Sequence, residues 1–124
     1  VSGVTPVAQL RLGESALELR AAASLIDRHW QLLDWHAHED VPVPDEQSAL
    51  WRQEDCYVGE LATRAVERLM TSGGGAAAYS SGALQRFWRD VHVVRGHVYF
   101  DFDNVAQQHA RAVLGLEPDP QLGP

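Results

Sequence analysis

The sequence predicts an all-α fold, an up-down four-helix bundle in one domain that covers residues 1–124. Three observations predict this class. In four successive stretches, apolar residues recur at every third or fourth position, which is the spacing of one face of a helix. Proline or glycine separates these stretches, and no segment of useful length shows the alternation of a half-buried strand. Four amphipathic helices with short links bury their apolar stripes by packing on one another.

The first helix is expected over residues 13–40, which contain no proline. Leu17 and Leu25 belong to a run of apolar residues in four-residue steps, which indicates a wide apolar face. Pro42 and Pro44 end this helix, because proline lacks an N–H donor and disfavours helical geometry in the residue before it.

The second helix is expected over residues 45–72, with Asp45 as its N-cap. The three glycines at 73–75 are expected to stop it, since glycine readily adopts the left-handed conformation of a helix C-terminus. The third and fourth helices are expected over residues 83–97 and 104–114, each with apolar residues at helical spacing.

The charge balance restricts the classes of partner. Seventeen acidic residues against ten lysines and arginines leave a formal charge of −7, which argues against nucleic acid and anionic lipid. No apolar run approaches the ~20 residues of a membrane span, so we expect no membrane association. The single cysteine, Cys56, agrees with a cytoplasmic location. Because the first residue is Val1 and not methionine, we expect a fragment of a longer polypeptide.

The histidines raise the alternative of a metal site. His92 and His97 bracket the end of the third predicted helix, and Asp101 and Asp103 follow it. Both residue types bind metals, but bundle metal sites usually use Glu-x-x-His pairs from facing helices, and this sequence has no such pair. Capping aspartates and surface histidines are the favoured interpretation, and we expect no metal.

Three segments of the C-terminal half resemble a known family: ALQRFWRDVH at 83–92, GHVYFD at 96–101 and LGLEP at 114–118. They look like the C-terminal end of two-component flavin-dependent monooxygenases built on the acyl-CoA dehydrogenase fold. Similar proteins are the oxygenase components that act on 4-hydroxyphenylacetate and on a steroid-derived phenol. The resemblance is specific over residues 80–120 and looser over the first two predicted helices.

The resemblance implies that this chain is the C-terminal four-helix bundle of a longer enzyme, about three domains of ordinary size or roughly 400 residues. The implied reaction is hydroxylation of an aromatic or related small molecule with O2 and reduced FMN or FAD. A separate flavin reductase would supply the reduced flavin, and the assembly would be a homotetramer.

The resemblance also implies the site residues. His97 matches the family's catalytic histidine, and an imidazole can accept a phenol proton at neutral pH or orient the hydroxyl group. Tyr99 and His92 are the expected substrate neighbours, and Arg89 and Trp88 the expected flavin neighbours. An arginine is a fixed positive charge suited to an anionic reduced flavin. The structural alternatives are a bond from His97 to the last carbonyls of its helix and an ion pair made by Arg89.

Two other functions stay open at this stage. The parent fold also includes acyl-CoA dehydrogenases, many of which carry a Tyr-Glu-Gly-Thr turn whose glutamate removes the substrate α-proton. Here the turn reads Tyr99-Phe100-Asp101-Phe102, and Phe100 cannot accept a proton, so dehydrogenation is disfavoured. The second alternative is a non-catalytic helical module that mediates oligomerisation.

Overall fold

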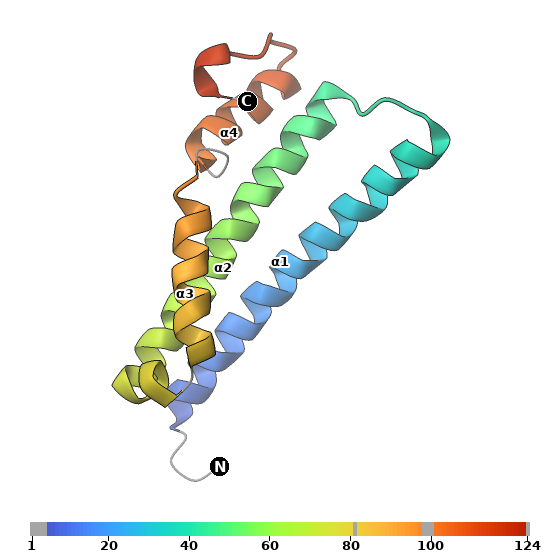
Figure 1. The fold of residues 1–124 in the computed structure, drawn as a ribbon. Coiled ribbons are helices and arrows are strands. Elements are labelled where there is room, and N and C mark those ends of the chain that lie inside the picture. The colour runs from blue at the N-terminus through green and yellow to red at the C-terminus, as the bar shows by residue number, and fades with distance from the viewer. Residues whose placement is uncertain (1–4, 81, 98–100, 124) are drawn as a thin grey trace.

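A computed structural model describes residues 5–80, 82–97 and 101–123, with side chains for all of these except 73–80 (Figure 1). The described residues form four α-helices and a short 3-10 turn, and they contain no strand. The all-α class predicted from the sequence is therefore confirmed. The elements are α1 (Pro6–Glu39), α2 (Asp45–Ser80), α3 (Gly82–Arg95), α4 (Phe102–Val113) and η2 (Pro120–Leu122).

Helix α2 lies at the centre of the fold and packs against each of the other three helices (Figure 1). α1 runs antiparallel along one side of α2, and α3 and α4 follow one another along the other side. The buried apolar residues lie mainly on α2, joined by one residue each from α1 and α4: Trp51, Cys56, Leu61, Ala65, Val66, Ala22 and Val105. Among the described residues, no helix combines the length and the apolar character that a membrane span requires.

Helix α1 begins at Pro6, earlier than the predicted start at residue 13. The hydroxyl of Thr5 caps it by accepting a hydrogen bond from the Ala8 backbone N–H at 3.1 Å. Proline suits the first position of a helix, because its missing N–H would have no partner inside the helix there. Residues 6–12 therefore belong to the helix.

Helix α2 continues to Ser80 and passes through Gly73, Gly74 and Gly75, so the predicted stop at residue 72 is wrong. Each glycine costs a helix only about 1 kcal/mol relative to alanine, and three alanines follow at 76–78. Glycine permits a left-handed end but does not impose one. The ends of α3 and the start of α4 lie within two residues of the predicted positions.

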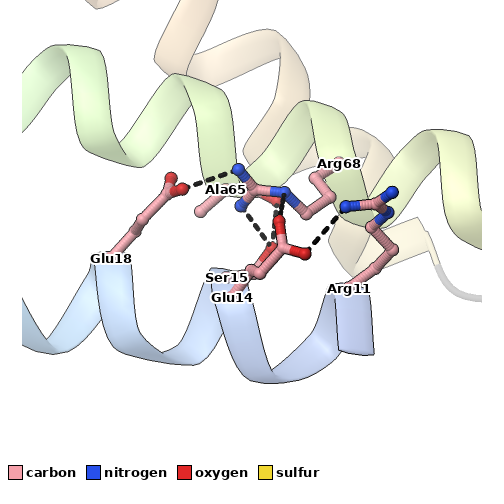
Figure 2. Close-up of polar contacts among 6 residues, drawn as sticks. All are labelled: Arg11, Glu14, Ser15, Glu18, Ala65 and Arg68. Atoms are coloured by element: carbon pink, nitrogen blue, oxygen red, sulfur yellow. Dashed lines mark hydrogen bonds and ion pairs between the residues drawn. The ribbon is translucent and has the colours of Figure 1, made fainter. Parts of the chain in front are cut away.

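A polar cluster fixes α1 against α2 near the start of α1 (Figure 2). The Arg68 guanidinium of α2 donates to Glu18 at 2.6 Å and lies 3.1 Å from a Glu14 oxygen. Ser15 is buried, and its hydroxyl donates to the Ala65 backbone carbonyl at 3.1 Å. The small Ser15 and Ala65 side chains let the two helices approach closely, and the arginine sets their register.

Candidate functional site

The sequence-predicted site residues lie on α3 and in the turn that follows it. His97 comes two residues after the last residue of α3, and its backbone N–H donates to the Val94 carbonyl at 3.1 Å. The residue is exposed, so its imidazole lies at the rim of the helical core. Tyr99 falls outside the described residues.

The structure brings two of the predicted residues, Trp88 and His92, into contact. Their ring centroids lie 4.3 Å apart with the planes tilted by 37°. The His92 Nδ1 atom donates to the Trp88 backbone carbonyl at 2.7 Å, which closes a local bridge one helical turn long. The indole is 36% exposed, so part of it remains available to a ligand.

The second ring nitrogen of His92 is also engaged. Its Nε2 lies 2.8 Å from a carboxylate oxygen of Glu67 on α2. A carbonyl and a carboxylate are both acceptors, so this geometry needs a hydrogen on each ring nitrogen, which is the positively charged form of histidine. The Trp88 carbonyl, and then Glu67, raise the pKa of His92 above its ordinary value. A hydrogen bond from His92 to a substrate would therefore have to replace one of these two bonds.

Arg89 is exposed, and no hydrogen bond or ion pair within the described part of the chain involves it. As the next residue after Trp88, it projects about 100° further around the helix. Arg95, near the end of α3, is instead paired with Glu60 of α2. Helix α3 therefore presents Arg89 as a cation on the side next to Trp88. His92 and Arg95, which pair with acidic residues of α2, hold α3 in place.

Two further histidines of the described chain, His29 and His36, have structural contacts. His29 stacks on Trp51 with ring centroids 4.8 Å apart, and its Nδ1 lies 3.1 Å from Asp55. His36 Nδ1 lies 3.0 Å from the Val41 carbonyl. Among the residues with described positions, no three histidine, cysteine, aspartate or glutamate side chains form a group that could hold a metal ion.

Sequence reasoning missed a cleft of about 440 Å³ between the first turns of α2, helix α4 and the C-terminal tail. Gln108 of α4 holds the tail, because its amide both donates to the Asp119 carbonyl and accepts from the Asp119 N–H. Gly115, in a left-handed conformation with φ of 73°, turns the chain back. The spacing of residues in the sequence gave no signal for this cleft. Its lining includes Ala49, Arg52, Val105, Gln108, Leu116 and Glu117.

With this geometry established, comparison with known proteins is decisive on the family. Residues 4–102 match the family described as acyl-CoA dehydrogenase, C-terminal domain. The chain belongs to this family. The match covers α1, α2 and α3 and reaches the first residue of α4.

Proteins similar to this chain are named as oxygenase components. The oxygenase component of p-hydroxyphenylacetate 3-hydroxylase from Acinetobacter baumannii is 32% identical over 120 residues, which cover 97% of this chain and 28% of that protein. The oxygenase component of an FADH(2)-dependent resorcinol hydroxylase from Rhizobium sp. is 29% identical, covering 94% of this chain and 29% of that protein. A flavin-dependent monooxygenase oxygenase subunit from Mycobacterium tuberculosis is 27% identical, with coverage of 91% and 29%. The resemblance found in the sequence is confirmed, and the chain spans less than a third of each relative's length.

Proposed function

We propose that this chain is the C-terminal helical domain of an oxygenase component that hydroxylates an aromatic small molecule with O2 and reduced flavin. The observation that carries the proposal is that more than nine tenths of the chain matches three proteins with oxygenase names. By this proposal a flavin reductase is the partner protein. A cytoplasmic location stays a prediction.

The exposed side chains of α3 fit the border of a flavin. Trp88 offers a partly exposed indole for contact with the ring system, and Arg89 offers a positive charge for the anionic reduced ring or its phosphate. When bound, reduced FMN or FAD supplies the electrons that activate O2 for hydroxylation. Other parts of the enzyme would complete the pocket, because α3 supplies one wall.

We assign the proton transfer to His97. Its exposed position beyond the end of α3 lets the imidazole reach into a cleft shared with other parts of the enzyme. There it would accept the proton of a phenol, which makes the ring more electron-rich, or orient the hydroxyl group. Tyr99 is proposed as a substrate neighbour. For His92, expected as a substrate neighbour, the contacts with Trp88 and Glu67 support a role in which it positions Trp88 beside the flavin.

The alternative dehydrogenase function is less well supported. The family name includes dehydrogenases, but phenylalanine occupies position 100, where the glutamate base of many of those enzymes would stand. A phenylalanine ring has no group that accepts a proton, so α-proton abstraction would need a base from elsewhere in the enzyme.

The proposal is tested in the full-length polypeptide with a panel of phenols, reduced flavin and ¹⁸O2. We expect one ¹⁸O atom in the hydroxylated product. The His97→Asn variant should form product at least about 100-fold more slowly, because a positioned acid or base typically contributes that much. It should continue to consume O2 and release hydrogen peroxide.

The matched control is His38→Asn, which alters an exposed histidine near the end of α1 and should leave the product yield unchanged. Unlabelled product, or reduction of an electron acceptor by an acyl-CoA thioester, would reject the hydroxylase assignment. An undiminished rate in His97→Asn would remove His97 from the reaction.

Exposed apolar residues on α1 favour a second role in assembly. Leu12, Leu19, Ile26 and Trp30 are 38–61% exposed and recur at spacings of seven or four residues, so they form one stripe beside the α2 contact. We propose that this stripe packs against further copies of the chain in a homotetramer. Trp30→Glu should shift the full-length protein to smaller species in sedimentation velocity, whereas Val93→Glu, on exposed α3 surface, should not.

A further inference from the structure

Two acidic residues of α2 hold α3 by its cationic side chains. Glu67 pairs with His92 at 2.8 Å, and Glu60 pairs with Arg95. The two glutamates are seven residues apart, or about two helical turns, so they lie on the same face of α2. The two pairs are equivalent in charge but not in chemistry, since only histidine changes its charge near neutral pH.

The Glu67–His92 pair is continuous with the proposed flavin wall. The His92 imidazole lies 2.8 Å from a Glu67 oxygen and 2.7 Å from the Trp88 carbonyl oxygen. Its ring centroid is 4.3 Å from that of the Trp88 indole. The pair also lies one turn before the end of α3, after which His97 follows. Any change in the His92 ring therefore acts on Trp88 directly and on the end of the helix that carries His97.

We propose that Glu67 is a positioning residue for the hydroxylation reaction, which holds Trp88 in place through the charged ring of His92. This inference rests on the proposed function. Glu67 contacts His92, and by this proposal it acts on the reaction through that neighbour.

The charged groups around His92 support the assignment of this role to Glu67 and not to Glu60. Glu67 and Glu60 face α3 from α2, and Arg64 lies between them in sequence on the same side. Arg95, on α3 itself, disfavours the protonated form of His92, whereas Glu67, on α2, favours it. Because Arg95 already has Glu60 as its partner, Glu67 is the acidic group that contacts the ring of His92.

The structure also determines the sign of the pH dependence. A histidine whose pKa is raised in the folded protein stabilises the fold below its unfolded pKa, and this contribution is lost as the pH rises through the folded pKa. The Trp88 contact should therefore be firm below the ordinary pKa of histidine and loosen as the pH rises through the raised pKa of His92. The yield of hydroxylated product per O2 consumed should decline over the same rise in pH, which we call the alkaline limb of the yield.

The test compares Glu67→Gln with the matched control Glu60→Gln in the full-length polypeptide. Glutamine keeps an oxygen that accepts a hydrogen bond but removes the charge. Two quantities are measured against pH: the titration midpoint of His92, followed by NMR of labelled histidine rings and assigned with His92→Gln, and the yield of hydroxylated product per O2 consumed.

We expect Glu67→Gln to lower the His92 midpoint and, by the same amount, the pH at which the product yield declines, because the charge that favours the protonated ring is lost. Glu60→Gln should leave both in place, and Glu67→Asp should restore most of the limb because it keeps the charge. If the midpoint falls in Glu67→Gln while the limb stays, or if Glu60→Gln moves the limb equally, the positioning role is overturned.

Failure of the proposed function gives a different result. A wild-type protein that hydroxylates no phenol at any pH would reject that function, and with it the role of Glu67 in the reaction. The same protein would still show the His92 midpoint and its dependence on Glu67.

Discussion

Replacing Val105 with alanine should loosen α4 from α2. Val105 is 2% exposed and is the only residue of α4 that is fully buried, so it anchors this helix. The change removes two methyl groups, which corresponds to about 1.6 kcal/mol of transfer free energy at ~0.8 kcal/mol each. Because Val105 also lines the cleft beside the C-terminal tail, the vacated space joins an open volume and adds little cavity energy.

The better helix propensity of alanine offsets part of this loss, up to ~0.6 kcal/mol, which leaves about 1–1.6 kcal/mol. In the limit of rapid reclosing, this difference accelerates amide hydrogen exchange of α4 by about 5–15-fold. The measurement is hydrogen exchange by mass spectrometry on peptides within residues 102–113 of the full-length polypeptide. Peptides from α1 provide the internal reference.

The control is Val113→Ala, which makes the same chemical change on the same helix at a side chain that is 55% exposed. It should alter exchange of α4 by less than about twofold, since exposed substitutions rarely change stability much. Equal acceleration in the two variants, or none in Val105→Ala, would refute the view that this one contact anchors α4.

Three further predictions follow from other contacts. Arg68→Met should accelerate hydrogen exchange of the first half of α1. The double variant with Glu18→Leu should exchange more slowly than the single variant, because a partly buried carboxylate without its cation is worse than an apolar pair. Slower exchange in the single variant than in the wild type would contradict this. Gln108→Ala should expose the tail to proteolysis near residues 119–123, whereas an unchanged cleavage rate would show that the amide does not hold it. Cys56 is 1% exposed and burial raises the pKa of its thiol, so alkylation should be slow and should speed up in Val105→Ala; rapid alkylation of the wild type would contradict the buried position.

The sequence by itself determined the helical character of the chain and most helix ends. Apolar spacing locates a helix because side chains three and four residues apart share one face, whatever that face later meets. Pro42 and Pro44 ended α1 for a reason internal to the backbone, and Asp101 was recognised as a candidate cap of α4. The glycines at 73–75 misled because their freedom allows a helix to end or to continue, and local preference does not choose between the two.

Part of the candidate site could be predicted from the sequence, and part of it required the tertiary structure. Residue types and their order placed a histidine, a tryptophan and an arginine on or just after α3, where resemblance gives them roles. Only the tertiary structure showed that α2 is the central helix, that Glu67 meets His92 from it, and that the tail folds over α4 to form a cleft. Periodicity specifies which side chains share a face of their own helix. Which faces meet depends on contacts between residues distant in sequence, such as Glu67 and His92, whose positions differ by 25, and these contacts form only when the helices pack.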